Sequence, residues 1–228
     1  MDKILVLSQP IFEQKPFFEY AQKLFKPGSR VFIVNYANEP AMLLKRFNRI
    51  GTPEKTEKYM AELREKLRFF SVTEENILYS SDDDTKDVFM KKYFNSDVLI
   101  FCGGAPESLL DKLEELNVTE LLKDSGKSAI AYSAGGEIFL EHLTLFPSSF
   151  WKNAGDYYKK LSTRKAIGLI KDLALSFHYT KDNEAFLQKA SNELCSVIYA
   201  LSDTDGAFVE NQKLRWIGTP KKFSPLGD

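Results

Sequence analysis

Short apolar runs alternate with longer segments of helical periodicity along almost the whole chain of 228 residues. Such runs are typical of buried parallel strands, and the amphipathic segments between them are typical of the helices that connect parallel strands. The alternation therefore predicts an α/β fold, with a mostly parallel central sheet and helices on both faces. The expected strands are residues 3–8, 30–36, 76–80, 97–103, 128–133, 173–178 and 197–202.

Local signals add detail to this framework. A helix is expected after Thr52–Pro53, where a cap residue precedes a proline in the first turn. Its apolar stripe consists of Met60, Leu63, Leu67 and Phe70. Residues 37–52 are expected to form a loop or a short extra helix. Runs 206–210 and 213–217 predict a C-terminal β-hairpin that turns at Asn211 and Gln212. Because there is no internal repeat and no long linker, we expect one domain over residues 1–228.

Charge and composition exclude several classes of protein. The chain has 31 basic and 32 acidic residues, so bulk charge does not favour a nucleic-acid or anionic-membrane partner. No segment approaches the roughly 18 apolar residues that a membrane span requires. Cys102 and Cys195 are the only cysteines, which rules out a disulfide framework and favours a reducing cytoplasm. The acidic segment 81–87 is interpreted as a helix start, since neighbouring carboxylates converge poorly on one ion. We therefore expect neither a metal nor a cofactor.

Ser133 lies where an expected strand ends and a helix begins, in the stretch "AIAYSAGGEIFLEHL". A nucleophile at such a corner needs small neighbours two residues to either side, as in the G-x-S-x-G elbow. Here the neighbours are Ala131 and Gly135. The N–H of Ala134 would then be placed to stabilise a developing oxyanion. The alternative is that the serine caps a helix and the glycines serve close packing.

A serine nucleophile needs a base, and the chain has only two histidines. His142 lies nine residues beyond Ser133 on the same expected helix, so about 13 Å would separate the two. His178 ends the expected strand 173–178. Functional groups gather at the carboxyl ends of parallel strands, and we therefore expect His178 and Ser133 at one edge.

The base in turn needs an acidic partner. Asp203 and Asp205 follow the next expected strand and complete the order Ser, His, Asp, with one of the two expected only to shape the turn before Gly206. Glu137 is a weaker competitor, because it lies on the same helix as Ser133 and not across the cleft.

A second glycine-rich corner, "FCGGAPESLL", follows the strand 97–103. Gly103 and Gly104 expose main-chain N–H groups there, and Gly104 could complete an oxyanion hole with Ala134. A plain strand-to-helix turn is the alternative interpretation. The aromatic residues of segment 146–158 are expected to line the cleft or to pack against the core.

These corners together resemble the peptidase E (aspartyl dipeptidase) family of serine peptidases, whose fold is related to class I glutamine amidotransferases. The segments that carry the resemblance occur in the family's order: "KILVLS", "CGGAPESLL", "YSAGGEIF", "LSFHYT" and "SDTDGAF". The resemblance covers most of residues 97–218.

By position, the resemblance implies that Ser133 is the nucleophile, His178 the general base and Asp205 the acid that orients it. It further implies oxyanion donors at Gly104 and Ala134 and substrate contacts at Gly103 and Ala105.

Several residues depart from the family pattern. Ala105 replaces an asparagine, and Phe177 replaces the proline before the histidine. Ala131 replaces a glycine, and Gly136 replaces an alanine. The segment after His178 contains no arginine, so the sequence does not favour specificity for an N-terminal aspartate.

The leading hypothesis is a cytoplasmic serine peptidase that acts on small peptides through an acyl-enzyme on Ser133. A second hypothesis keeps this machinery for another acyl or branched-peptide substrate, as in the related cyanophycinases. A third is a catalytically silent module that binds a small anion at the glycine corners. The sequence determines neither the substrate nor the oligomeric state.

Overall fold

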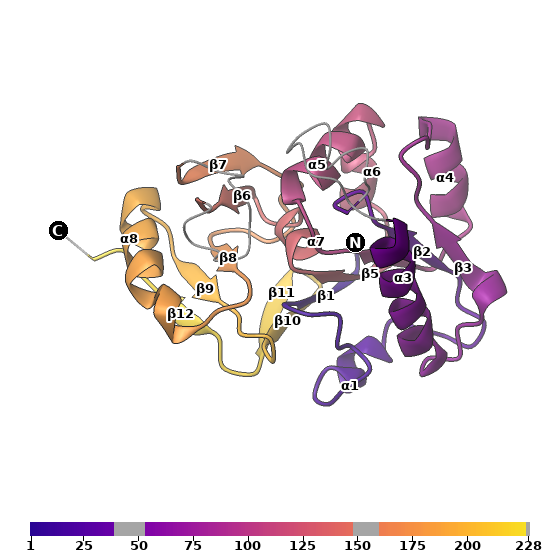
Figure 1. The fold of residues 1–228 in the computed structure, drawn as a ribbon, viewed down its shortest axis with the longest axis horizontal. Coiled ribbons are helices and arrows are strands. Elements are labelled where there is room, and N and C mark those ends of the chain that lie inside the picture. Colours follow the sequence, from indigo (N-terminus) through magenta and orange to yellow (C-terminus); the bar gives the residue numbers. More distant parts are fainter. Residues whose placement is uncertain (39–52, 148–159, 227–228) are drawn as a thin grey trace.

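The computed structural model describes residues 1–38, 53–147 and 160–226 (Figure 1). A seven-stranded sheet with the order β11-β10-β1-β5-β4-β2-β3 forms its centre. Strands β1, β5, β4, β2 and β3 are parallel, while β10 is antiparallel to both β1 and β11. The predicted α/β class with a mostly parallel sheet is thus confirmed. The strands are β1 (Lys3–Leu7), β2 (Val31–Val34), β3 (Ile77–Tyr79), β4 (Val98–Phe101), β5 (Ser128–Tyr132), β10 (Gly206–Glu210) and β11 (Lys213–Ile217).

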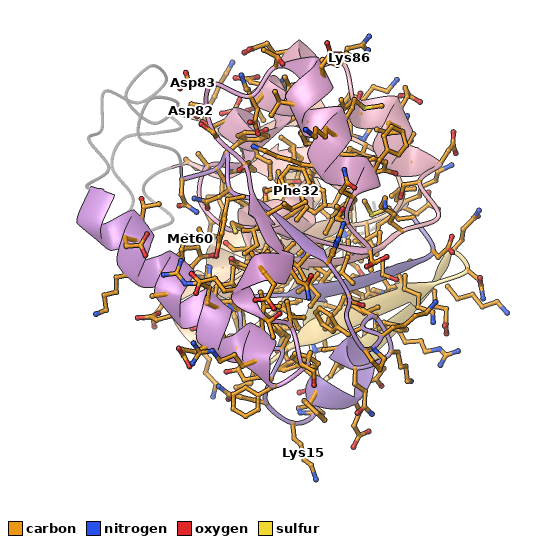
Figure 2. All side chains as sticks on the ribbon, turned by 90° about the vertical axis from the view of Figure 1, so that its right-hand side faces the viewer. Lys15, Phe32, Met60, Asp82, Asp83 and Lys86 are labelled. Atoms are coloured by element: carbon orange, nitrogen blue, oxygen red, sulfur yellow. The ribbon has the colours of Figure 1, made fainter. Side chains whose placement is uncertain are left out.

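Helices cover both faces of this sheet, because successive side chains of each buried strand point to opposite sides. In β1, Ile4 and Val6 face one hydrophobic core, whereas Leu5 and Leu7 face the other. Figure 2 shows Phe32 near the centre of the molecule, where it packs in the first core. That core is covered by α4 (Lys86–Phe94), α5 (Pro106–Glu115), α6 (Thr119–Lys123) and α7 (Ala134–Glu137). The second core is covered by α1 (Phe18–Ala21) and α3 (Pro53–Arg68).

A separate three-stranded sheet contains the expected strands 173–178 and 197–202. It has the order β12-β9-β8, with β8 and β9 parallel and β12 antiparallel to β9. These strands do not join the central sheet, because the antiparallel strand β10 pairs with the free edge of β1. The elements are β8 (Ala174–Ser176), η3 (Lys181–Asn183), α8 (Glu184–Leu194), β9 (Ile198–Ala200) and β12 (Lys221–Phe223). They enclose a small hydrophobic core of their own. Figure 1 shows these elements together at one side of the molecule.

The prediction of one helix running from Ser133 to His142 is wrong, because the helix is much shorter. Helix α7 ends at Glu137, and β6 (His142–Leu145) pairs antiparallel with β7 (Ser162–Lys165). Two glycines in the first turn weaken the helix, and Ile138, Phe139 and Leu140 turn into the core instead. His142 is exposed at the start of β6, so the helical distance on which its exclusion rested does not apply.

Several local predictions are confirmed. The hairpin strands are β10 and β11, with Asn211 and Gln212 at φ 52° and 61°, as a type I′ turn requires. The expected stripe of α3 is buried in the second core. A short helical turn, η1 (Glu74–Asn76), precedes β3. Residues 39–52 of the expected loop and residues 148–158 of the aromatic segment lie outside the described residues. Within the described ranges, no helix has the length and apolar character needed to cross a membrane.

Candidate active site

Ser133 occupies a strained corner between the sheet and a helix. It directly follows β5, stands immediately before α7, and has φ 51° and ψ −127°, a conformation that non-glycine residues rarely adopt. Its N–H donates to the carbonyl oxygen of Leu7 at the end of β1, at 2.9 Å. Its hydroxyl makes no capping hydrogen bond to the helix that it begins. The corner therefore directs the hydroxyl away from the helix, and the capping alternative does not describe this serine.

The small residues around Ser133 are required by close main-chain contacts. A Cβ at Gly135 would lie 2.2 Å from the carbonyl oxygen of Phe101, so no larger residue fits. A Cβ at Gly103 would lie 3.1 Å from Cβ of Ser133. The two glycine-rich corners that the sequence indicates thus meet directly, at the carboxyl ends of β4 and β5.

Two of the departures from the peptidase E pattern explain each other. A Cβ at Gly136 would lie 2.9 Å from Cζ of Phe177 and 2.8 Å from Cγ1 of Val6. The ring of Phe177 therefore fills the space that an alanine at position 136 would take. Gly136 therefore makes room for the ring of Phe177. Phe177 directly precedes His178 in the chain.

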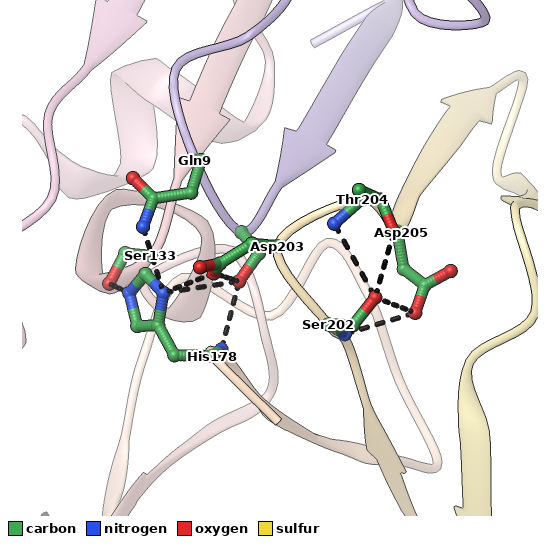
Figure 3. Close-up of polar contacts among 8 residues, drawn as sticks. Gln9, Ser133, His178, Ser202, Asp203, Thr204 and Asp205 are labelled. Carbon is green, nitrogen blue, oxygen red and sulfur yellow. Dashed lines mark hydrogen bonds and ion pairs between the residues drawn. The ribbon is translucent and has the colours of Figure 1, made fainter. Parts of the chain in front are cut away.

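The imidazole of His178 faces the hydroxyl of Ser133, as Figure 3 shows. Nε2 of His178 lies 3.1 Å from Oγ of Ser133. His178 follows β8 and has φ 56°, so both members of the pair occupy the left-handed region of φ. The structure brings together the two residues that the sequence selects, although β8 belongs to a different sheet from β5.

The carboxylate next to His178 belongs to Asp203. This corrects the expectation that Asp205 is the acid that orients the imidazole. Oδ1 of Asp203 lies 2.7 Å from Nδ1 of His178. A carboxylate only accepts hydrogen bonds, so this contact requires a proton on Nδ1 and leaves Nε2 free to accept from Ser133. Asp205 instead points into the turn before β10 (Figure 3). Its carboxylate accepts from the N–H and hydroxyl of Ser202 and from the N–H of Thr219.

The choice between the two aspartates depends on parallel pairing in the small sheet. Ser176 of β8 lies opposite Ala200 of β9, and the N–H of Leu201 donates to the carbonyl oxygen of Ser176. The chains after both strands therefore leave the same edge together. Asp203 lies at the beginning of that turn, beside His178, whereas Asp205 lies at its end and is buried.

Sequence reasoning missed Ser8 and Gln9, which follow β1. The hydroxyl of Ser8 accepts from the N–H of His178 at 2.8 Å and donates to Oδ1 of Asp203 at 3.3 Å. The side-chain amide of Gln9 lies 3.2 Å from Nδ1 of His178. No local signal marks these residues, since 170 positions separate Ser8 from His178.

Gly104 and Ala134 are the two candidate oxyanion donors at these corners. Gly104 has φ 131°, and its neighbour Ala105 anchors the turn by donating its N–H to the carbonyl oxygen of Ala37. Asn38 donates to the carbonyl oxygen of Gly103 and holds the turn from its other side. Within residues 1–38, 53–147 and 160–226, the N–H groups of Gly104 and Ala134 have no acceptor.

Glu137, the weaker candidate for the acid, is a buried carboxyl at the end of α7. Its Oε2 atom has no hydrogen-bond partner among the described residues. Burial raises the pKa of Glu137 well above the ordinary value of 4.5. Because no hydrogen bond joins this carboxyl to His178, whereas Asp203 contacts Nδ1 of the ring, Glu137 does not take the role of the triad carboxylate.

Replacing Glu137 by glutamine is expected to increase stability at neutral pH. Since its folded pKa is raised, the wild type loses stability as pH rises above 4.5, by about 1.4 kcal/mol per pH unit until the folded pKa is reached. Glu137→Gln removes this loss, so the two proteins should match at pH 4 and differ by more than about 1 kcal/mol at pH 7. Urea unfolding at both pH values measures the difference. Glu62→Gln, on the exposed face of α3, is the control, and equal shifts in both variants would contradict a raised pKa at Glu137.

Arg164 of β7 and the acidic segment 81–87 have structural partners. Arg164 pairs with Asp111 and Glu114 of α5, each at 2.5 Å, and is therefore not a free cation for a substrate. Asp84 of the acidic segment accepts from Tyr36 and Lys92, and Thr85 caps α4. Among the described residues, no group of three or more metal-ligating side chains converges.

Comparison with known proteins supports the fold. No protein-family model matches the chain, and no curated protein matches it. Among solved structures, 14 chains match, including the crystal structure of a "Putative Peptidase E Protein from Listeria monocytogenes EGD-e". Its TM-score is 0.62 and its identity 17%, over 95% of this chain and 98% of that chain. The chain therefore has the same fold as this protein along nearly the full length of both.

Proposed function

We propose that this protein is a serine peptidase of the peptidase E type, which hydrolyses small peptides through an acyl-enzyme on Ser133. One observation carries the proposal: a hydroxyl, an imidazole and a carboxylate lie in line, with contacts of 3.1 Å and 2.7 Å. This is the arrangement of a catalytic triad, in which the acid fixes the tautomer of the base. The fold likeness to the Listeria protein adds support, because that protein is named a "Putative Peptidase E Protein".

In the acylation step, Oγ of Ser133 attacks the carbonyl carbon of the substrate and its proton passes to Nε2 of His178. The N–H groups of Ala134 and Gly104 stabilise the negative oxygen that develops. His178 then donates the proton to the nitrogen of the leaving amine as the carbon–nitrogen bond breaks. Asp203 holds Nδ1–H in place and stabilises the charged imidazole.

In the deacylation step, water attacks the acyl carbon and gives its proton to His178, which returns it to Oγ of Ser133. The carboxylic acid product leaves and the free enzyme is restored. No other group is needed for the proton transfers. Gly103 and Ala105 adjoin Gly104 in the chain and are the proposed substrate contacts. Because the N–H of Ala105 donates to Ala37 and its carbonyl oxygen accepts from Leu109, Ala105 would contact the substrate through its methyl group.

A fluorophosphonate probe tests the nucleophile without knowledge of the substrate. We expect one equivalent of probe to attach to the wild type, with the added mass on the peptide that contains Ser133. Labelling should disappear in Ser133→Ala and slow strongly in His178→Ala, because the base no longer removes the proton. Mass mapping of the digest locates the adduct.

Absence of labelling in folded wild type, together with thermal stabilisation by small anions, would favour the silent binding module instead. If labelling occurs, a panel of dipeptides, amides and esters separates a peptidase from another acyl hydrolase. Release of a free amine from unmodified dipeptides, with an initial burst, is the result expected for a small-peptide substrate.

A further inference from the structure

We infer that Ser8 is a positioning residue, which sets the geometry of both His178 and Asp203 from the end of β1. This inference rests on the proposed function, because it assigns a role within the same triad. The hydroxyl of Ser8 accepts from the main-chain N–H of His178 at 2.8 Å and lies 3.3 Å from Oδ1 of Asp203. One side chain is thereby bonded to the general base and to its acid.

The end of β1 connects the base to the nucleophile as well. The carbonyl oxygen of Leu7 accepts the N–H of Ser133 at 2.9 Å, and the next residue, Ser8, accepts the N–H of His178. Strand β1 is paired on both sides, by β5 and by β10. The last residue of a central strand and the residue after it thus fix the main chains of Ser133 and His178, which follow strands of different sheets.

The triad needs such an anchor because burial alone restrains the side chains of Asp203 and His178 only weakly. The side chain of Asp203 is 58% exposed and that of His178 is 33% exposed, whereas Ser8 is 1% exposed. His178 also has φ 56°, which is unfavourable for a non-glycine residue unless neighbouring groups hold it. A buried hydroxyl bonded to both residues supplies that restraint.

Gln9 completes the contacts to Nδ1 but is a weaker candidate for this role. Its amide lies 3.2 Å from Nδ1 of His178, and the hydroxyl of Ser8 lies 3.4 Å from the same atom. The nearest atom of that amide is Nε2, and because Nδ1 carries the proton toward Asp203, two donors face each other and no hydrogen bond forms between them. Gln9 contacts the imidazole alone, whereas Ser8 contacts three groups, and Ser8 therefore carries the inference.

The rate of Ser133 labelling by the fluorophosphonate measures the effect of Ser8 without a known substrate. We expect Ser8→Ala to lower that rate about 10–100-fold, the loss typical of groups that orient a reactive residue. Ser8→Thr, which keeps the hydroxyl, should restore most of it. Ser80→Ala is the matched control, since Ser80 also follows a strand and accepts a main-chain N–H, that of Asn35, at 2.8 Å.

A double-mutant cycle separates positioning from a general loss of stability. In an Asp203→Asn background, Ser8→Ala should cause little further loss of labelling rate, because both changes act on the same imidazole. Full additivity of the two losses, or an equal loss in Ser80→Ala, would overturn the inference. So would unchanged labelling in a folded Ser8→Ala protein. Failure of the wild type to label would instead reject the proposed function itself, and thus the two failures are distinguishable.

Discussion

Ser133→Ala is expected to lower kcat by up to about 10⁶-fold, the loss found when the nucleophile of a serine peptidase is removed. Residual activity should come only from the oxyanion donors at Ala134 and Gly104, which remain in place. The hydroxyl of Ser133 makes no capping hydrogen bond, so its removal should change the free energy of unfolding by less than about 0.5 kcal/mol. Amine release from the best dipeptide of the panel, followed over hours, measures the residual rate.

Ser96→Ala provides the control for this substitution. Ser96 is buried and bonded to the carbonyl oxygen of Tyr93, at the end of α4 and outside the proposed site. The control should lose some stability and keep its kcat. Comparable turnover by Ser133→Ala and the wild type would show that Ser133 is not the nucleophile.

Asp203→Asn is expected to lower kcat by about 10⁴-fold at neutral pH, the loss typical of the triad acid. Asparagine keeps the size of the side chain but cannot stabilise a charged imidazole, and its amide favours the wrong tautomer. Stability should change little, because the side chain of Asp203 is 58% exposed. Steady-state kinetics and thermal unfolding of the same preparation give both quantities.

Asp205→Asn is the matched comparison and should show the opposite pattern. Its carboxylate accepts three hydrogen bonds in the turn before β10, so the change should cost about 1–3 kcal/mol of stability. We expect kcat to fall less than about tenfold, an effect transmitted only through the turn that also holds Asp203. A large loss of kcat in Asp205→Asn with little loss in Asp203→Asn would show instead that Asp205 is the triad acid, as the family resemblance implies.

Local sequence patterns were sufficient to predict the elements that depend on residues close to one another in the chain. The C-terminal hairpin is predicted to the residue, because Asn211 and Gln212 both tolerate the positive φ of its turn. The buried strands are recognisable because β-branched and apolar runs bury both faces. The prediction failed after Ser133, where an apolar run suggested a long helix and tertiary packing formed a short turn and β6 instead.

The sequence alone determined the α/β class, the strand-to-helix corner at Ser133 and the nomination of His178. It could do so because strand periodicity, small residues at a tight turn and the scarcity of histidine are all readable within a few positions. Only the tertiary structure decided that β8 and β9 form their own sheet, that Asp203 and not Asp205 meets the imidazole, and that Ser8 connects them. Those outcomes depend on hydrogen bonds between segments up to 195 positions apart, and no local pattern of residues encodes such a contact.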